Sequence, residues 1–478
     1  MRQGRFFAAG GGTAFDMQQS MDDITGYLTA NGGRFEEDLC ALLRIPSISA
    51  DPGRRADLRK AAEWVAGQFR GLGLAAELIE TSGQPLVYAQ SPAVPGRPTV
   101  LVYGHYDVQP VEPLEEWISP PFEPTRRNGN LYARGATDDK GQMLTHLFST
   151  EAWLKTRGQL PVQLKFLIEG EEEVGSRALF EYLGQAAARQ KLAADIAVIS
   201  DTSQFGPGQP AITYGLRGGM WFELSAVGPR QDLHSGTFGG AVANPINAIC
   251  KLLAALIDER GRVQVPGFYD DVVPLTAEER RRFAELPFSE EKFKQQIGVI
   301  EVAGEEGYTT LERRWARPTY DILGIWGGQQ MPKSAIPARA GAKASFRLVP
   351  NQDPQKIAAA TREFLLARCP PGIQLEVKTM SAARGVVVPL ESPYVQAASR
   401  AIEQSFGKAP VLIREGGSIP IVTAFREQLG IDTLLLGWGL DDDNTHSPNE
   451  KFCLADFHRG IQASARLWQE LSRTATGG

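Results

Sequence analysis

Hydrophobic and polar positions along the chain predict alternating helices and strands. Residues 54–73 repeat apolar side chains three and four positions apart and stop at glycine, which is the pattern of an amphipathic helix. Four apolar runs end in polar residues, as buried strands do: TVLVYGHYD (99–107), VQLKFLIEG (162–170), ADIAVISD (194–201) and DTLLLGWG (432–439). Helical segments lie between these runs, so we expect an α/β fold with a mostly parallel sheet that helices cover on both faces.

A different pattern begins after residue 213. The run MWFELSAVG (220–228) is shorter and more alternating, and a helix follows with Asn244 as its cap. The polar segment 262–320 predicts no clear element, and the parallel-sheet pattern resumes only near residue 390. We therefore expect a disordered leader at 1–17, an α/β domain built from 18–213 and 390–478, and an inserted α+β domain at 214–389.

Charge and cysteine content narrow the class of partner. The chain of 478 residues carries a net charge of -6, so it has no basic surplus with which to bind nucleic acid or an anionic membrane. No apolar stretch reaches the ~18 residues of a membrane span. The four cysteines are far apart and form no CxxC pair, which disfavours a thiolate zinc site and a disulfide framework and fits a reducing cytoplasm. Small molecules are the partners that remain.

The strand at 162–170 runs into a crowd of carboxylates, LIEGEEEVGS (167–176). Adjacent like charges raise one another's pKa and stay together only if water, cations or a transferable proton relieves them. Taken alone, such a run is most simply a solvated acidic loop. However, the carboxyl ends of strands in an open α/β sheet share one crevice. We expect these strand-end residues to converge there: His105, Asp107, Asp138, Glu172, Glu173, Asp201 and His446.

This set of side chains suits a dinuclear metal site. Two imidazoles with several carboxylates and no thiolate favour zinc, or manganese or cobalt, with one bridging carboxylate. Two such metals can polarise a carbonyl and acidify a shared water, as amide hydrolysis requires. Asp107 shares a strand face with His105 and can hold its imidazole, unless it is an ordinary strand-ending aspartate. His146 and His458 fall in helical patterns, where a packed or surface histidine is the simpler interpretation.

Nine ordered motifs, spread over nearly the whole chain, resemble one family. It is the dinuclear metallopeptidases that include aminoacylase, glutamate carboxypeptidases and, closest in style, carnosinase-like cytosolic dipeptidases. The motifs are YGHYDVQP (103–110), LYARGATDDKG (131–141), EGEEEVGS (169–176), ISD (199–201), YGLRG (214–218), DLHSG (232–236), FRLVP (346–350), REGGSIP (414–420) and THSPNE (445–450). Nine blocks in order are far more specific than any one of them. The resemblance implies that the inserted domain is a ferredoxin-like lid and dimerisation domain.

The resemblance also implies a catalytic centre with two divalent ions per subunit, Zn²⁺ before Mn²⁺ or Co²⁺. One metal would be held by His105, Asp138 and Asp201, and the other by Asp138, Glu173 and His446, so that Asp138 bridges. Glu172 would be the general base that takes a proton from the metal-bridging water and returns it to the leaving amine. A cis peptide bond after Asp138 is implied as well. Glu171 would have no role in the site, and Glu169 would support the metal ligands without binding a metal itself.

The inserted domain and the GGSIP motif would supply the contacts to substrate. His234 would stabilise the oxyanion, commonly from the partner subunit of a homodimer. Arg347 would grip the terminal carboxylate of the substrate through its planar fork, and Gly417 and Ser418 would help to seat it at a helix start. Ser334 falls where dipeptidase relatives carry a small hydroxyl residue that reaches across the dimer. Without the resemblance, His234 would be a loop residue, Arg347 a surface residue and Ser418 a helix cap.

The sequence thus predicts a metal-dependent dipeptidase for substrates with a free C-terminal carboxylate. An N-acyl-amino-acid deacylase or a carboxypeptidase of the same family is the alternative, because side-chain specificity cannot be read from the motifs. A non-catalytic metal- or peptide-binding homologue is a third hypothesis, which the loss of Glu172 or of a metal ligand would favour; the chain keeps them all.

Overall fold

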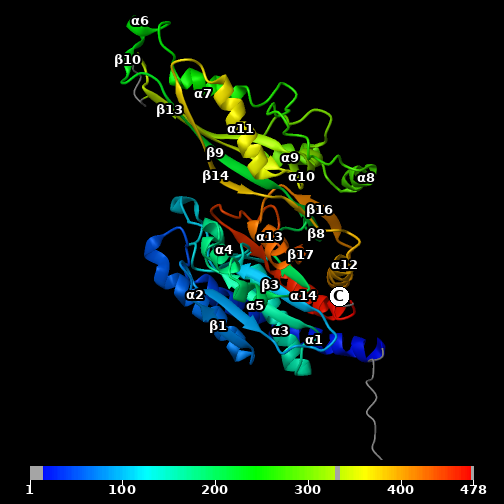
Figure 1. The fold of residues 1–478 in the computed structure, drawn as a ribbon. Helices are drawn as coiled ribbons and strands as arrows, with labels where there is room; N and C mark the ends of the chain where they lie inside the picture. Colours follow the sequence, from blue (N-terminus) through cyan, green and yellow to red (C-terminus); the bar gives the residue numbers. More distant parts are fainter. Residues whose placement is uncertain (1–13, 329–333, 475–478) are drawn as a thin grey trace, which may run out of the picture. The chain divides into compact units, whose positions relative to one another are not determined.

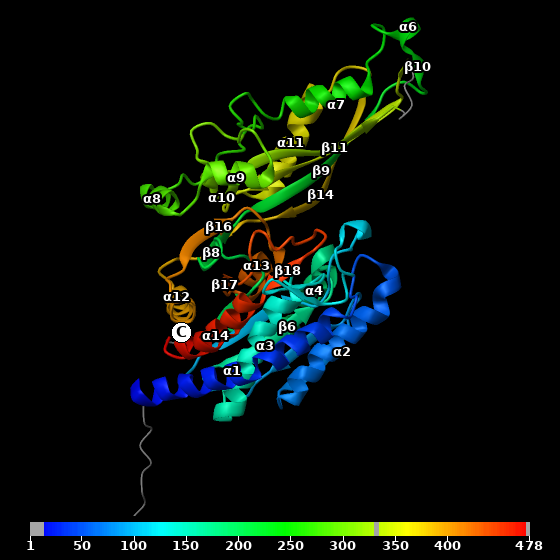
Figure 2. The same ribbon diagram turned by 180° about the vertical axis from the view of Figure 1, so that it is seen from behind.

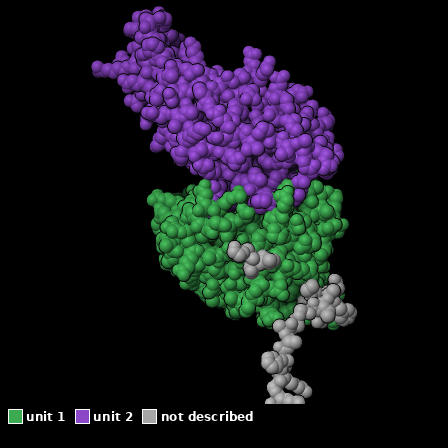
Figure 3. Space-filling view, turned by 45° about the vertical axis from the view of Figure 1, so that its right-hand side comes forward, with its two compact units in different colours: residues 1–212, 390–411, 425–478 green, residues 213–389, 412–424 purple. Residues whose placement is uncertain are grey.

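The structure is a computed structural model that describes residues 14–328 and 334–474. The chain forms two compact units, which Figure 3 colours separately. Unit 1 comprises Met1–Ile212, Leu390–Val411 and Phe425–Gly478, and unit 2 comprises Thr213–Pro389 and Leu412–Ala424. The leader predicted at 1–17 lies outside the described residues up to residue 13, and residues 14–17 already belong to the first helix.

Unit 1 is built on a sheet whose strands follow the order β1-β2-β6-β3-β7-β17. The four predicted strand runs form β3, β6, β7 and β17, which pair in parallel, whereas β1 and β2 join the edge antiparallel. The α/β fold with a mostly parallel sheet is therefore confirmed. The strands are β1 (Ala75–Ile79), β2 (Leu86–Gln90), β3 (Thr99–His105), β6 (Gln163–Glu169), β7 (Ile196–Ile199) and β17 (Thr433–Gly437), and a small separate sheet contains β4 (Thr125–Arg127), β5 (Asn130–Tyr132) and β18 (Lys451–Cys453).

Helices cover the unit 1 sheet because their apolar stripes need a partner surface. The helices α1, α3 and α14 lie side by side in both views of the ribbon, and α3 packs on β3 (Figures 1 and 2). Helix α2 packs on β1 and β2, and α12 packs on α14. The helices are α1 (Ala14–Leu43), α2 (Arg55–Gly71), α3 (Lys140–Arg157), α4 (Arg177–Leu183), α5 (Ala186–Leu192), α12 (Pro393–Phe406) and α14 (Leu454–Leu471), with a π-helical turn at Phe425–Leu429.

Unit 2 contains a four-stranded antiparallel sheet in the order β11-β13-β9-β14. Its elements follow the chain order strand, helix, strand, strand, helix, strand, which is the ferredoxin-like connectivity that was predicted for the insert. The helices α7 and α11 pack on this sheet (Figure 1). The core between them and the sheet includes Phe222, Leu252 and Phe346. The six elements are β9 (Gly218–Val227), α7 (Pro245–Ala254), β11 (Thr319–Gly327), β13 (Arg339–Leu348), α11 (Pro354–Arg368) and β14 (Gln374–Ala383).

The remaining elements of unit 2 are short. The segment 262–320, for which the sequence predicted no element, forms α8 (Ala277–Glu285), α9 (Glu290–Ile297) and α10 (Thr310–Ala316). Residues 412–424 group with unit 2, although the sequence assigned them to the other domain, and β16 pairs with β8. The others are β8 (Ala211–Leu216), β10 (Leu233–His234), α6 (Ser235–Phe238), β12 (Ala335–Ile336), β15 (Val386–Val387), β16 (Val411–Glu415) and α13 (Pro420–Ala424). Within the described part of the chain, no helix is long and apolar enough for a membrane span.

Candidate metal centre

The parallel strands of unit 1 bring the predicted polar residues to one edge of the sheet. His105 is the last residue of β3 and pairs in register with Glu169, the last residue of β6. Asp201 follows β7, the neighbour of β3 on its other side. The loop after β17 carries His446, and Asp138 lies just before α3. Four strand ends and one helix start therefore supply the site, as expected for parallel strands.

The side chains form two groups that share Asp138. One contains His105, Asp138 and Asp201, the other Asp138, Glu173 and His446, and one ligand atom from each member lies within 4.8 Å of the others in its group. His105 Nε2 is 3.1 Å from one oxygen of Asp138, and His446 Nε2 is 2.9 Å from the other. The peptide bond between Asp138 and Asp139 is cis, as the resemblance implied. These residues are the two ligand sets that the sequence assigned.

The electrostatics of the two groups fit bound cations. The Nε2 atom of His105 is buried and has no hydrogen-bond partner among the described residues, although oxygens of Asp138 and Asp201 lie 3.1 and 4.0 Å away. Burial opposes ionisation of Asp138, but the adjacent imidazoles of His105 and His446 outweigh it and hold its pKa well below the usual value. Burial and the charge of Asp138 raise the pKa of Glu173 and of Asp201. A divalent ion in each group would relieve this repulsion and give the imidazole nitrogen a partner.

Asp107 contacts the turn that carries Glu172 and Glu173 in addition to His105. His105 Nδ1 lies 3.1 Å from the backbone carbonyl of Asp107 and 3.3 Å from its Oδ1, so Asp107 can orient the imidazole as predicted. Its two oxygens also accept hydrogen bonds from the backbone N–H groups of Glu172, at 3.3 Å, and Glu173, at 3.1 Å. One buried carboxylate thus fixes both a histidine and the turn that carries the two glutamates.

The glutamates of the acidic run lie in different surroundings. Glu172 begins a short 3-10 turn. Burial raises its pKa to about 7, with smaller contributions from the charges of Glu173 and Asp138, although the charge of His105 acts in the opposite direction. Glu173 accepts a hydrogen bond from Gln109 at 2.7 Å and lies 3.3 Å from His446. Glu171 faces away, where backbone N–H groups of Gln84 and Ala178 bind it. The alternative of a solvated acidic loop is therefore disfavoured for Glu172 and Glu173, which face the two ligand groups.

The loop that carries His446 has an unusual backbone. His446 has φ of 63°, and Asn444 and Asn449 have φ of 56° and 63°. Non-glycine residues rarely adopt this left-handed region, and they do so mainly where the surrounding structure requires it, often at functional sites. The two histidines in helices agree with the simpler interpretation of packed or surface residues. His146 is buried between the hydroxyls of Ser464 and Ser200, and His458 pairs with Glu36.

His234 and Ser334 lie together in unit 2. His234 is exposed at the end of β10 and pairs in register with Ala335 of β12. The backbone carbonyl of Ser334 accepts hydrogen bonds from the N–H and the hydroxyl of Ser235, at 3.0 and 3.1 Å. The Nδ1 atom of His234 accepts the N–H of Gly236 at 3.1 Å, so the proton of a neutral ring resides on Nε2.

Arg347 and Ser418 also meet within unit 2. Arg347 is half-buried on β13, stacks over the ring of Trp221 at 5.1 Å and donates to the hydroxyl of Ser418 at 3.3 Å. Ser418, next to Gly417, donates in turn to the carbonyl of Arg217 at 2.6 Å. Sequence reasoning missed Arg217: its buried guanidinium binds the carbonyls of Gly416, Arg313 and Arg317 and so holds the GGSIP loop. It lies inside the quoted YGLRG motif, but its partners are remote in sequence.

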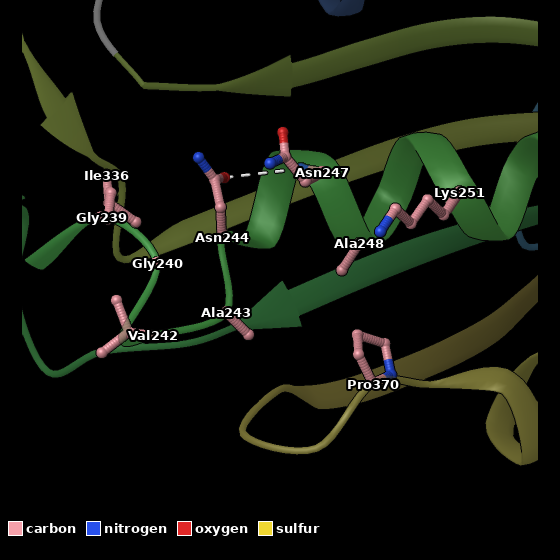
Figure 4. A pocket seen from close by; sticks show the side chains of 10 residues that line it. All are labelled: Gly239, Gly240, Val242, Ala243, Asn244, Asn247, Ala248, Lys251, Ile336 and Pro370. Carbon is pink, nitrogen blue, oxygen red and sulfur yellow. Dashed lines mark hydrogen bonds between the residues drawn. The ribbon is translucent and has the colours of Figure 1, made fainter. Parts of the chain in front are cut away.

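Unit 2 also contains a cavity of about 400 Å³ beside the start of α7 (Figure 4). Asn244 caps the helix there by accepting the N–H groups of Ile246 and Asn247. Lys251 is the one ionisable residue among those that line the cavity, and none of the predicted site residues does. The chemistry of the chain is therefore not centred on this cavity.

Comparison with known proteins agrees with the motifs. Residues 101–470 match the family described as Peptidase family M20/M25/M40. The sequence is 32% identical to the Cys-Gly metallodipeptidase dug1 of Schizosaccharomyces pombe, over 95% of this chain and 99% of that protein. It is 33% identical to the Beta-Ala-His dipeptidase of Homo sapiens, over 92% of this chain and 86% of that protein. The solved M20 family metallo-carboxypeptidase Sso-CP2 from Sulfolobus solfataricus has a TM-score of 0.84 at 33% identity, covering 92% of this chain and 99% of that one. The predicted family resemblance is confirmed.

Proposed function

The chain belongs to peptidase family M20/M25/M40, and on that premise we propose that it hydrolyses the peptide bond of dipeptides with a free C-terminal carboxylate. The observation that carries the proposal is the pair of histidine and carboxylate groups joined at Asp138, with the partly buried Glu172 beside them. Two similar proteins are named for their action on dipeptides, Cys-Gly and Beta-Ala-His. In this proposal unit 1 is the catalytic domain and unit 2 the lid and dimerisation domain.

Each subunit would bind two divalent ions. His105, Asp138 and Asp201 would hold one, and Asp138, Glu173 and His446 the other. Imidazole and carboxylate donors without thiolate suit Zn²⁺, and also Mn²⁺ or Co²⁺. Such ions, when bound, polarise a carbonyl and lower the pKa of water.

Glu172 would act as the general base. Its carboxylate accepts a proton from the attacking water and then delivers that proton to the amine that leaves. The raised pKa of about 7 supports this role, because a group that titrates near neutral pH both accepts and releases a proton readily. Asp107 supports it as well, since its bond to the N–H of Glu172 fixes the turn from which the carboxylate acts.

His234 would donate a hydrogen bond to the oxyanion that develops on the substrate carbonyl. The N–H of Gly236 occupies Nδ1, so the ring keeps its proton on Nε2 for donation. Arg347, Gly417 and Ser418 would bind the C-terminal carboxylate of the substrate, for which a half-buried guanidinium beside a hydroxyl is suited. Ser334, whose backbone binds the residue after His234, would accompany it across the dimer.

A homodimer is part of the proposal. Strand β11 is an edge strand of the unit 2 sheet and exposes four large apolar residues: Ile322, Leu323, Ile325 and Trp326. An exposed apolar edge is a template for pairing with another chain, and a second copy covers both edges at once in a two-fold dimer. A cytoplasmic location is consistent with the four cysteines, all of which are free.

A carboxypeptidase acting on longer peptides is the second candidate, because Sso-CP2 has that name and a similar structure. Both functions use the same carboxylate contact and the same base. Hydrolysis rates for a dipeptide and for a longer peptide with the same C-terminal residue decide between them. A higher kcat/KM for the longer peptide would replace the dipeptidase proposal.

Substitution of Glu172 tests the proposed chemistry. Glu172→Gln should lower kcat by about 10²- to 10⁴-fold, the usual contribution of a general base, while two metal ions per chain remain bound. Elemental analysis gives the metal content, and a dipeptide assay gives kcat. Glu171→Gln is the matched control, because this neighbouring carboxylate faces backbone N–H groups away from the ligands, and it should keep normal kcat. Near-normal turnover by Glu172→Gln rules out its role as base.

A further inference from the structure

Glu450 is a fully buried carboxylate to which the sequence analysis gave no role. It ends the THSPNE motif, four positions after His446. Its Oε1 accepts the backbone N–H groups of Thr137, at 3.0 Å, and Asp138, at 3.2 Å. Its Oε2 accepts the N–H of Gly135 at 2.9 Å and the guanidinium of Arg134 at 2.8 Å. Both oxygens are therefore bound to the segment that leads into Asp138.

Further contacts tie the same two segments together. Strand β18 begins directly after Glu450 and pairs antiparallel with β5, which ends shortly before Arg134. The backbone carbonyl of Glu450 accepts the N–H of Ala133 at 3.1 Å. The hydroxyl of Thr137 lies 3.0 Å from the carboxylate of Asp443, in the loop that leads to His446. The carboxylate of Glu450 thus stands at the junction of the two loops that carry Asp138 and His446.

The position of Asp138 needs such a support. Its carboxylate belongs to both ligand groups, so a shift of its backbone would disturb the donors of both sites at once. A loop held only by its ligand contacts would be free to shift before any cation is bound. Backbone N–H groups bound to a buried carboxylate resist the movement, because each would lose a charge-assisted hydrogen bond that water cannot replace inside the protein.

We propose that Glu450 is a positioning residue that holds the backbone of Asp138 in place for both metal ions before they bind. This role for Glu450 rests on the proposed function, in which Asp138 is a ligand of both metal ions. Glu450 contacts neither substrate nor metal in this role, and it acts through Asp138. Arg134, which binds Oε2, neutralises the buried charge.

The test measures metal affinity rather than activity. Glu450→Gln keeps the shape of the side chain. However, the amide NH₂ group takes the place of one carboxylate oxygen, where it faces N–H donors and cannot accept their hydrogen bonds. We expect Zn²⁺ to bind the metal-free, full-length variant about 10- to 100-fold more weakly than wild type at both sites, in competition with a chromophoric chelator. The absorption spectrum of the Co²⁺-loaded variant should change too, because Asp138 reaches both ions. Unchanged Zn²⁺ affinity in a folded Glu450→Gln variant overturns the proposal.

Two comparison variants separate positioning from stability and from the proposed function. Glu470 is also buried and binds two arginines, Arg400 and Arg473, so Glu470→Gln should lower stability without weakening Zn²⁺ binding. An equal loss of affinity in Glu470→Gln means that general destabilisation explains both variants and overturns the proposal. Asp138→Asn should lose metal binding outright. If Asp138→Asn binds Zn²⁺ like wild type, the ligand set of the proposed function is wrong, whatever Glu450→Gln does.

Hydrogen exchange on the wild-type protein decides the matter if Glu450→Gln does not fold. The N–H groups of Gly135, Thr137 and Asp138 should be protected in the metal-free protein as strongly as in the Zn²⁺-loaded protein, because Glu450 binds them in both. Fast exchange of these three N–H groups without metal overturns the proposal.

Discussion

Glu169 and Glu172 stand three positions apart at the end of β6, yet their surroundings give them different chemistry. Glu169 is buried and accepts the hydroxyl of Tyr103 at 2.7 Å, and burial raises its pKa to about 8. The raised pKa favours its protonated form, and a glutamine closely matches that form in shape and charge. Glu172 must accept and release a proton, which glutamine cannot do.

This difference predicts unequal effects of one substitution. Glu169→Gln keeps an acceptor for Tyr103, so we expect kcat to stay within about tenfold of wild type, the usual range for a perturbed hydrogen bond. Glu172→Gln should lose far more, as stated above. Parallel measurements of kcat at pH 7 on one dipeptide compare the two. Equal losses at Glu169 and Glu172 would mean that the base is not confined to Glu172.

Residues that belong to recognisable motifs could be placed at the candidate site from the sequence, as the grouping of His105, Asp138 and His446 shows. Residues that bind backbone groups far away in the sequence could not be predicted in this way. The oxygens of Glu450 meet N–H groups more than 300 positions away in the sequence, with Thr137 as one example at 313 positions. The carboxylate of Asp107 likewise meets the N–H of Glu173 after a separation of 66 positions. A single sequence shows such residue types but not the contacts that explain them.

At the scale of elements, the apolar runs were a strong signal because parallel strands are buried on both faces. Runs such as 99–107 and 162–170 form β3 and β6, and their ends meet at the candidate metal centre. The helices α8 and α10 were missed because they are short, but each begins with a capping box. Thr276 with Glu279, and Thr309 with Glu312, supply the local signal that could have found them.

The end of β13 and the GGSIP loop make a second element-scale prediction. Arg347 lies on β13 and binds Ser418 in the loop, and its planar fork suits a carboxylate better than the point charge of lysine. We expect Arg347→Lys to raise KM for a free dipeptide by about tenfold or more and to leave KM for its C-terminally amidated analogue unchanged. Steady-state kinetics on both substrates measure this.

The same strand offers the control. Arg339, at the other end of β13, is exposed, and Arg339→Lys should leave KM for both substrates as in wild type. If Arg347→Lys affects the amidated and the free dipeptide equally, Arg347 does not bind the substrate carboxylate.

At the scale of the whole molecule, the proposed dimer places His234 in the active site of the partner. Mixing subunits with Glu172→Gln and subunits with His234→Ala then restores activity, because a mixed dimer contains one site with both residues intact. Random exchange in a two-fold dimer should give about a quarter of wild-type activity. Co-expression with two affinity tags yields the mixed dimer. No activity in the mixed dimer means that His234 acts within its own chain.

The family could be predicted for the whole molecule because the motifs occur in order along nearly the entire chain. The grouping of residues 412–424 with unit 2 could not, because it depends on the pairing of β16 with β8, which are separated by about 200 residues. Long-range pairing of short strands leaves little trace in local sequence.

Reconstitution of the metal-free protein tests the proposed function most directly. Chelation should abolish hydrolysis of a free dipeptide, and titration with Zn²⁺, Mn²⁺ or Co²⁺ should restore it in proportion to the occupancy of two ions per chain. A panel of dipeptides, acetylated amino acids and longer peptides should show the highest kcat/KM for a dipeptide. Hydrolysis that persists after complete removal of metal, or no hydrolysis of any dipeptide with both sites filled, would contradict a dinuclear metallodipeptidase.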